Sequence, residues 1–312
     1  MSKKPEHVFL IDGSGFIFRA YYALPPMTRP DGTPVNAVFG FIKMVMKLVD
    51  DTDAEHIAVI FDRARKTFRN DIYADYKANR PPPPEDLIPQ FDLVRDATRA
   101  LNVACVDMDG FEADDLIATY ARLAIEAGAD VTIVSSDKDM MQLVRPGVVM
   151  MDAMKDKIIG SDEVMEKFGV EPDKVIEVQA LAGDSSDNVP GVSGIGVKTA
   201  AQLINEYGDL ETLLARASEI KQPKRRQNLI DEADAARLSR RLVTLMDDVP
   251  VEIDLSTFAV KEIKAETLLA FLVEQNFKSL IRTAEARFGV SVQSGAPAET
   301  DATTNAAGPG AE

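Results

Sequence analysis

Acidic residues of this chain gather where predicted strands end and predicted helices or loops begin. Asp12 and Asp62 each close a short apolar run, and three denser groups follow at 112–115, 137–139 and 184–187. Each group alone also fits an ordinary helix start or turn. Together they call for another explanation, because several carboxylates at one place cannot all stay ionised without cations. The pattern therefore indicates a cation-binding site.

The residue types favour a hard divalent cation. The chain has one cysteine, Cys105, and two histidines, His7 and His56, each of which precedes a predicted strand, away from the acidic residues. This composition excludes a cysteine-based zinc site and any internal disulfide. Carboxylate oxygens are the ligands that Mg²⁺ and Mn²⁺ prefer. So many of them favour two metal ions, an arrangement that suits in-line displacement at phosphorus.

Alternating strands and helices should bring these side chains together. The apolar pattern predicts strands at 8–12, 57–62 and 131–137, and helices at 36–49, 85–101 and 113–127. Such alternation predicts an α/β fold with a doubly wound, mostly parallel sheet, whose ligands bind beyond the carboxyl ends of the strands. Three of the strands end in Asp, so we expect the acidic residues to meet at that edge.

The rest of the chain reads as helical. Helices are predicted at 162–168, 173–181, 197–207, 210–217, 225–246 and 264–275, with a short strand near 251–253. From 291 to 312 the composition collapses to small and acidic residues, which predicts a disordered linker or tail. We therefore expect an α/β core over 1–160, a helical subdomain over 161–290, and the tail over 291–312.

Residues 63–80 form a basic segment in an acidic chain. The segment has six basic and two acidic residues, with Phe68, Tyr73 and Tyr76 among them. Basic residues that meet phosphates, together with aromatic residues that stack on bases, are typical of single-strand binding. A solvated helical face would have a similar composition. Prolines at 81–84 should end any helix there.

A second segment with a nucleic-acid signature is the glycine-rich turn at 194–199. Gly194 and Gly196 allow backbone amides to approach a phosphate closely, and Lys198 and Thr199 then open a helix whose N-terminus favours the same anion. Such a turn would grip a backbone without reading sequence. A plain tight turn between helices is the alternative.

The composition bounds the class of protein. The chain is 46% apolar and 28% charged, as in folded soluble proteins. It has no apolar run of the ~18 residues that a membrane helix needs, and its first residues do not resemble a secretory leader. We expect a cytoplasmic, nucleoid-associated protein. The net charge of −16 argues against a nucleic-acid partner until the clustered carboxylates are neutralised by metal.

The ordered motifs resemble the 5′-nuclease domains of bacterial DNA polymerase I, within the flap-endonuclease superfamily. The resemblance runs over about residues 5–290. Besides the acidic groups, it rests on Leu10-Ile11-Asp12-Gly13-Ser14, Tyr76-Lys77-Ala78-Asn79-Arg80-Pro81 and Gly194-Ile195-Gly196-Val197-Lys198-Thr199-Ala200. It implies a PIN-like, Rossmann-like core, a helical arch at 63–84 and a helix–three-turn–helix DNA clamp.

The resemblance also implies roles for single residues. Two Mg²⁺ or Mn²⁺ ions are implied, the first served by Asp12, Asp62, Glu112 and Asp114, and the second by Asp115, Asp137, Asp139, Asp184 and Asp187. The implied catalytic cations at the scissile phosphate are Lys77 and Arg80. The implied DNA-binding residues are Arg19, Lys66, Arg69, Tyr76, Gly194, Gly196, Lys198 and Thr199. A potassium ion held by backbone oxygens of the clamp loop is implied as well.

The expected activity is that of a metal-dependent 5′-3′ exonuclease and flap endonuclease. It would leave 5′-phosphate and 3′-hydroxyl ends during replication and repair. Its expected partner is DNA with a 5′ flap, or nicked or primer-containing duplex. The protein is expected to act as a monomer and not to bind a membrane. Tethering to a polymerase domain in a longer protein stays open, and no polymerase activity is expected here.

Two alternatives belong to other classes. One is a non-catalytic flap-binding module, against which the complete set of nine carboxylates counts. The other is a PIN-type single-strand ribonuclease, against which the glycine-rich clamp motif counts.

Overall fold

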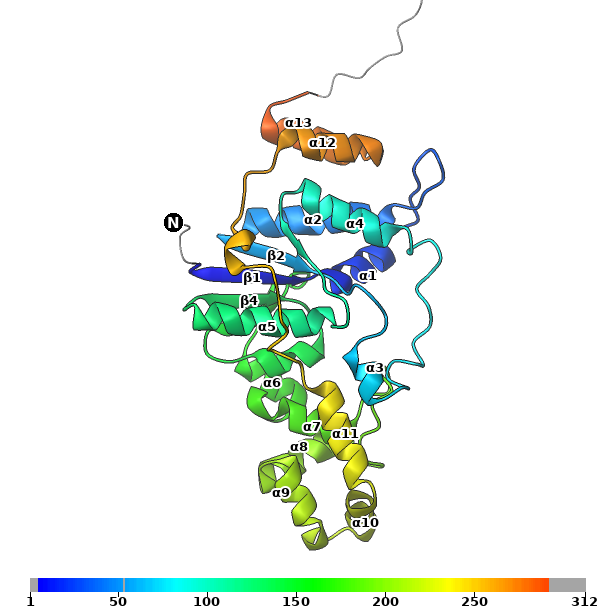
Figure 1. The fold of residues 1–312 in the computed structure, drawn as a ribbon, viewed down its shortest axis with the longest axis vertical. Coiled ribbons are helices and arrows are strands. Elements are labelled where there is room, and N and C mark those ends of the chain that lie inside the picture. The colour runs from blue at the N-terminus through cyan, green and yellow to red at the C-terminus, as the bar shows by residue number, and fades with distance from the viewer. Residues whose placement is uncertain (1–4, 53, 292–312) are drawn as a thin grey trace, which may run out of the picture. The chain divides into compact units, whose positions relative to one another are not determined.

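A six-stranded sheet forms the centre of the fold (Figure 1). The computed structural model describes residues 5–52 and 54–291, so the predicted tail beyond residue 291 lies outside the described residues. The strands are β1 (His7–Asp12), β2 (His56–Ile60), β3 (Ala104–Val106), β4 (Asp130–Val134), β5 (Val148–Asp152) and β6 (Lys157–Ile159). Their order is β3-β2-β1-β4-β5-β6, and β6 alone among them runs antiparallel to its neighbour.

The direction in which strands are added to the sheet reverses beside β1, and this reversal marks where a ligand site is expected. The chain first adds β2 and β3 on one side of β1, and then β4, β5 and β6 on the other. In register, Leu10 of β1 lies between Ala58 of β2 and Ile133 of β4, and all three are buried. Ligands bind at such a switch point, beyond the carboxyl ends of the strands. The prediction of a mostly parallel α/β sheet is confirmed.

Helices cover both faces of the sheet (Figure 1). On one side α1 (Gly13–Ala23), α2 (Asn36–Asp51) and α4 (Gln90–Ala100) pack on one another. On the other side α5 (Ala113–Glu126) packs on β1 and β4. Helix α1 was not predicted, because Gly13 and Gly15 in its first turn hide the pattern. Asp12 compensates as its N-cap by accepting a bond from the amide of Gly15.

The helical part differs in detail from the prediction. Its helices are α6 (Ser161–Phe168), α7 (Val175–Ala182), α8 (Val197–Tyr207), α9 (Leu210–Ala215), α10 (Pro223–Asp231) and α11 (Ala233–Val243). The single helix predicted at 225–246 is two helices, because Glu232 leaves the helical conformation with φ −109° and ψ 19°. Residues 251–253 form no strand, and β3, β5 and β6 were not predicted.

The arch segment is mostly irregular. Within 63–84 the structure has one short helix, α3 (Phe68–Ile72), which ends at Tyr73. Turns follow, and Lys77 adopts a left-handed φ of 56°, which a continuous helix would not allow. Within the arch implied at 63–84, only Phe68–Ile72 is therefore helical.

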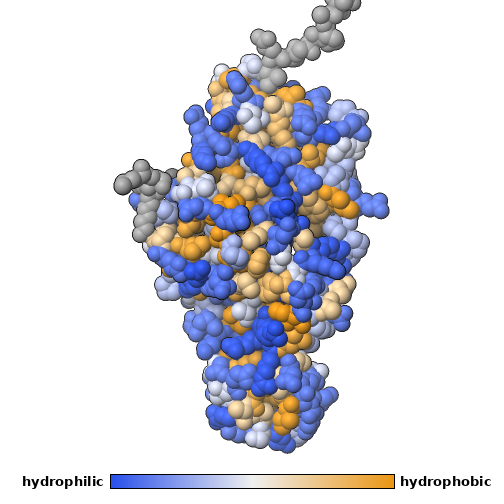
Figure 2. All heavy atoms as spheres, in the orientation of Figure 1, coloured by the Kyte–Doolittle hydropathy of each residue, from blue (hydrophilic) through white to orange (hydrophobic). Residues whose placement is uncertain are grey.

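The chain divides into two units, residues 1–264 and 265–312. The described part of the second unit consists of α12 (Ala265–Glu274) and α13 (Lys278–Phe288), joined through Asn276 with φ 58°. No helix within the described ranges is long and apolar enough to cross a membrane. Most of the face in Figure 2 is hydrophilic, with the hydrophobic atoms in small separate areas.

Two glycines close the loop that holds Asp184 and Asp187. Gly183 has φ 68° and ψ −178°, a conformation that essentially glycine alone adopts. A Cβ there would lie 2.6 Å from the carbonyl oxygen of Val189 and would also crowd Gly191. Asp184 and Val189 exchange backbone bonds of 2.8 and 3.0 Å. The loop geometry therefore depends on close backbone contact.

We expect Gly183→Ala to lower stability by about 1–3 kcal/mol, seen as a drop in Tm of several degrees. Gly196→Ala is the matched control, since Gly196 has φ −98° and a Cβ added there would meet no atom within 4 Å. Its Tm should match that of the parent chain. Equal midpoints for both variants would contradict the strain at Gly183.

Candidate active site

Asp12 and Asp62 stand at the carboxyl ends of two neighbouring strands. Asp12 is buried, and its carboxylate accepts bonds from the Gly15 amide (2.8 Å) and the Ser135 hydroxyl (2.9 Å). Burial raises the pKa of Asp12 to about 6. The two hydrogen bonds lower this pKa, and repulsion from Asp62 and Asp137 adds a smaller increase. Asp62 accepts a bond from the Ala113 amide (2.9 Å), which brings the start of α5 over β2.

Asp114, in the first turn of α5, completes this first group. Its pKa lies well above the usual range, because of burial and then repulsion from Asp137, Asp12 and Asp62. Four carboxylates thus lie close enough to perturb one another, as the strand-end pattern predicted. Hard oxygen donors that resist ionising together fit a divalent cation.

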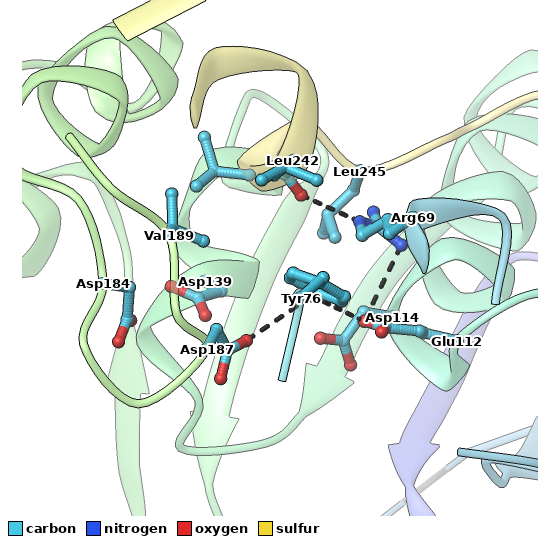
Figure 3. A pocket seen from close by; sticks show the side chains of 11 residues that line it. Arg69, Tyr76, Glu112, Asp114, Asp139, Asp184, Asp187, Val189, Leu242 and Leu245 are labelled. Atoms are coloured by element: carbon cyan, nitrogen blue, oxygen red, sulfur yellow. Dashed lines mark hydrogen bonds and ion pairs between the residues drawn. The ribbon is translucent and has the colours of Figure 1, made fainter. Parts of the chain in front are cut away.

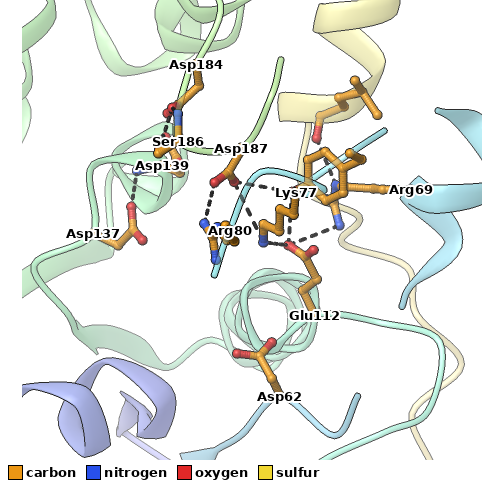
Figure 4. A network of polar contacts seen from close by, with 12 residues as sticks. Asp62, Arg69, Lys77, Arg80, Glu112, Asp137, Asp139, Asp184, Ser186 and Asp187 are labelled. Atoms are coloured by element: carbon orange, nitrogen blue, oxygen red, sulfur yellow. Dashed lines mark hydrogen bonds and ion pairs between the residues drawn. The ribbon is translucent and has the colours of Figure 1, made fainter. Parts of the chain in front are cut away.

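A second group lies between α5 and the arch segment (Figure 4). Lys77 Nζ lies 2.9 Å from Glu112 Oε2 and 3.7 Å from Asp187 Oδ2, and Arg80 pairs with Asp187. Although burial opposes it, Glu112 and Asp187 raise the pKa of Lys77. Lys77 and Arg80 therefore carry their positive charge beside these two carboxylates.

The third group joins Asp139 and Asp184 through Lys138. Lys138 Nζ contacts Asp139 Oδ1 (2.8 Å) and Asp184 Oδ2 (2.5 Å). Against the effect of burial, bonds from Lys138 and Ser186 lower the pKa of Asp184 to about 2. Burial and Asp137 instead raise the pKa of Asp139.

A cavity with both charged and apolar walls connects the second and third groups (Figure 3). The carboxylates in its lining are Glu112, Asp114, Asp139, Asp184 and Asp187. Within residues 5–52 and 54–291, no three acidic, histidine or cysteine side chains form a ready-made ligand set. Lys77, Arg80 and Lys138 lie between the carboxylates instead.

Asp115 departs from its expected role. It is fully buried, and its two oxygens accept bonds of 2.7 Å each from Arg69. They also accept the amides of Glu112 (3.1 Å) and Met246 (2.9 Å). Its acceptor positions are thus used inside the protein, and Asp115 holds Arg69 rather than facing the cavity.

Two residues expected to bind DNA are also placed differently. Arg69 is 1% exposed and Tyr76 is 6% exposed, so neither can reach a nucleic acid in this arrangement. The ring of Tyr76 packs with Val189 and Leu242, and its hydroxyl lies 3.3 Å from Glu112. The basic and aromatic composition of this segment is therefore partly explained by packing.

The other expected DNA-binding residues lie at the surface. Lys66, Gly194, Gly196 and Lys198 are exposed, and Thr199 is half-buried at the start of α8. Arg19 is half-buried and bonds to Asp152 (3.1 Å) and Ser136 (2.8 Å). It borders a cavity of about 430 Å³ beside Asp12 and Asp137.

The arch segment is bonded to the loop that carries Asp187. The Lys77 amide donates to the carbonyl of Asp187 (2.9 Å). The Asn79 side chain donates to the carbonyl of Ser185 (2.6 Å), and the Asn188 side chain to the carbonyl of Asp75 (2.7 Å). Two turns more than 100 residues apart therefore form one hydrogen-bonded surface.

Sequence reasoning missed several residues that organise the site. Ser135 bonds to Asp12, and Lys138 bridges two carboxylates. Gln142 bonds to the carbonyl of Asp139 (2.8 Å) and to residue 243. Lys138 could have been noticed between its two Asp neighbours. Gln142 had no such signal, because its partners at residues 243 and 245 lie about 100 residues away.

Comparison with known families identifies the class. Residues 7–169 match the 5′-3′ exonuclease N-terminal resolvase-like domain, and residues 170–266 match the 5′-3′ exonuclease C-terminal SAM fold. The chain belongs to the 5′-3′ exonuclease family. The resemblance and the enzyme class expected from the sequence are thus confirmed.

Individual relatives agree with this assignment. The chain is 59% identical over 288 residues to DNA polymerase I of Rhizobium leguminosarum, covering 90% of this chain and 28% of that relative. It is 35% identical over 281 residues to a 5′-3′ exonuclease of Aquifex aeolicus, covering 90% of this chain and 96% of that protein. It therefore spans about a quarter of the first relative and nearly all of the second.

A solved structure shares the fold. The flap endonuclease of bacteriophage T5, in a complex with DNA and metal ions, superposes with a TM-score of 0.65 at 22% identity. The match covers 89% of this chain and 99% of that one. The expected PIN-like fold is confirmed.

The raised pKa of Asp12 predicts a pH effect on stability. The folded-state pKa of about 6 exceeds the usual aspartate value of 3.8. The stability that protonated Asp12 adds to the fold is therefore fully present below about pH 4 and is lost as pH rises through 6. In EDTA, we expect the Tm of the parent chain to fall relative to that of Asp12→Asn as pH increases. Parallel curves of Tm against pH would contradict the shift.

Proposed function

We propose that this chain is a divalent-metal-dependent 5′ nuclease that cleaves phosphodiesters at 5′ flaps and 5′ ends of DNA and of RNA primers. One observation carries the proposal: carboxylates from three strand ends, the start of α5 and the loop at 184–187 lie together, and Lys77 and Arg80 of the arch pair with two of them. The relative from bacteriophage T5 was solved with DNA and metal ions, which supports the same partners here.

In this proposal two Mg²⁺ or Mn²⁺ ions are held by eight carboxylates. The first ion would use Asp12, Asp62, Glu112 and Asp114, and the second Asp137, Asp139, Asp184 and Asp187. Bound divalent ions supply positive charge to the phosphate and acidify the attacking water. Asp115 would not bind metal in this proposal and would instead hold Arg69 in place through their ion pair.

The protein's own residues would position and neutralise the substrate. Lys77 and Arg80 lie at the carboxylates and would move to the scissile phosphate, adding charge as the transition state gains it. Arg19 would hold the strand near Asp12. Products would carry 5′-phosphate and 3′-hydroxyl ends.

The glycine-rich turn would be the duplex clamp. Ile195 is buried and anchors the turn, while Gly194, Gly196 and Lys198 are exposed. Asn228 of α10 donates to the carbonyl of Ser193 (2.6 Å), and Glu232 accepts the amide of Ser193. Exposed amides on a fixed turn suit a phosphate backbone. A potassium ion on backbone oxygens of this loop belongs to the same proposal.

We propose the residue ranges 1–160 for the catalytic core and 161–290 for the helical DNA-binding part. The two sequence relatives show both a nuclease within a longer polymerase and a nuclease that is almost the whole protein. A role in primer removal and repair suits either arrangement. We expect a monomer in the cytoplasm, acting on DNA.

Cleavage of a labelled 5′-flap duplex tests the proposed function. Activity should vanish in EDTA and return with Mg²⁺ or Mn²⁺. Asp114→Ala should slow single-turnover cleavage by about 100-fold or more, while flap binding in Ca²⁺ stays near that of the parent. Asp92→Ala, at an exposed carboxylate in α4, should cleave normally. Normal cleavage by Asp114→Ala would refute the site.

A salt titration tests the clamp. Lys198→Ala should weaken binding to all duplex-containing substrates alike and reduce the slope of log affinity against log salt by about one phosphate contact. Lys43→Ala, at an exposed lysine in α2, should leave the slope unchanged. An effect confined to one base sequence would rule out backbone gripping.

A further inference from the structure

Residues 242–246 form a short backbone segment, here called the strap, which begins in the last turn of α11 and runs through the site. Arg69 donates to the carbonyls of Leu242 (2.8 Å) and Thr244 (3.1 Å). The side chain of Gln142 donates to the carbonyl of residue 243 (3.0 Å) and accepts the amide of residue 245 (3.1 Å). Each of these four residues thus has a backbone group bonded to one of two side chains.

The two side chains come from opposite groups of carboxylates. Gln142 lies in the 3-10 helix Lys138–Leu143, and it also donates to the carbonyl of Asp139 (2.8 Å). Arg69 is paired with Asp115 of α5, next to Asp114, and lies 3.7 Å from Glu112. The strap therefore connects the carboxylates of α5 with those around Asp139.

Burial makes this connection stiff. Arg69 is 1% exposed and Asp115 is not exposed at all. Asp115 accepts the amide of Met246 (2.9 Å), which fixes the far end of the strap. Removing one partner of a buried ion pair typically costs about 3–5 kcal/mol, so the pair resists being pulled apart.

The strap also forms one wall of the cavity. Leu242, Val243 and Leu245 line it opposite Asp139 and Asp184 (Figure 3). In Figure 3 the dashed line from Leu242 leads to Arg69, which reaches the carboxylates of α5. Apolar side chains here exclude water from one side of the charged groups.

We propose that Arg69 and Gln142 are positioning residues that set the spacing between the α5 carboxylates and those at 137–139 by holding the strap between them. This inference rests on the proposed function, in which these carboxylates bind divalent ions. Two ions that act on one phosphate must stand about 3.5–4 Å apart, so a small change in spacing should weaken metal binding. Neither side chain needs to touch metal or substrate.

The strap further links the clamp to the carboxylates. Ser239 of α11, three residues before the strap, accepts the amide of Gly191 (2.8 Å). Gly191 lies in the segment that leads to the glycine-rich turn. A duplex bound at that turn would therefore be connected, through Gly191 and Ser239, to the helix that continues into the strap.

The test measures metal binding directly. Gln142→Leu keeps the approximate volume and removes all three bonds made by the amide. We expect Mn²⁺ affinity, measured by calorimetry, to fall about 10-fold or more, with flap binding in Ca²⁺ changed by less than about twofold. Single-turnover cleavage should need correspondingly more metal.

Gln90→Leu is the matched control. Gln90 is a fully buried glutamine in α4, and it accepts the amide of Ala37 (2.8 Å) and donates to the carbonyl of Asp86 (2.9 Å). Its loss should lower Tm at least as much as Gln142→Leu, yet leave Mn²⁺ affinity intact. Arg69→Lys is a second variant, which keeps the charge beside Asp115 but loses the planar fork. It should weaken Mn²⁺ binding in the same way.

The outcomes separate the inference from the proposed function. Wild-type Mn²⁺ affinity in both Gln142→Leu and Arg69→Lys would overturn the positioning role. An equal loss of affinity in Gln90→Leu would also overturn it, since the effect would then follow general loosening. A parent chain that neither binds Mn²⁺ nor cleaves the flap would refute the proposed function itself.

Discussion

Mutual repulsion among carboxylates is the constraint on which the rest of this structure depends. A parallel sheet brings Asp12 and Asp62 to one edge, and α5 adds Asp114, whose pKa is raised by burial and by its neighbours. Such a group is unfavourable unless positive charge is supplied. At the neighbouring carboxylates, Lys77 pairs with Glu112, and Lys138 pairs with Asp139 and Asp184. Both come from segments outside the sheet, so the loops are held to the core by the charges they neutralise.

The sequence was sufficient for the parts that obey local rules. Apolar runs that end in Asp predicted β1, β2 and β4 and the edge where they meet, because buried parallel strands leave a clear mark. The clustered acidic residues predicted the site because their types and their positions at element ends can be recognised without knowing which residues they contact. The break at Glu232 and helix α1, with its two glycines, were not predicted. At those places the turn conformation and the helix cap outweigh the amphipathic pattern.

Long-range pairing decided the residues that the sequence misassigned. Arg69 belongs by composition to a basic nucleic-acid segment, yet it is buried against Asp115 and the carbonyl of Leu242, 173 residues away. No spacing rule connects those positions. Tyr76 likewise has the composition of a stacking residue and the environment of a core residue. A charged or aromatic residue therefore reveals its role only once the element that covers it is known.

The hydrogen bonds between the arch and the Asp187 loop also limit where this chain can change in length. An inserted residue between Asp75 and Asn79 would shift the register against Ser185 and Asn188 and leave backbone carbonyls unpaired. Between Pro81 and Glu85 the chain is exposed or half-buried, and doubling a loop there would cost only about 0.6 kcal/mol of closure entropy. Natural variation or an engineered insertion should therefore be accommodated after Pro81 and rejected just before it.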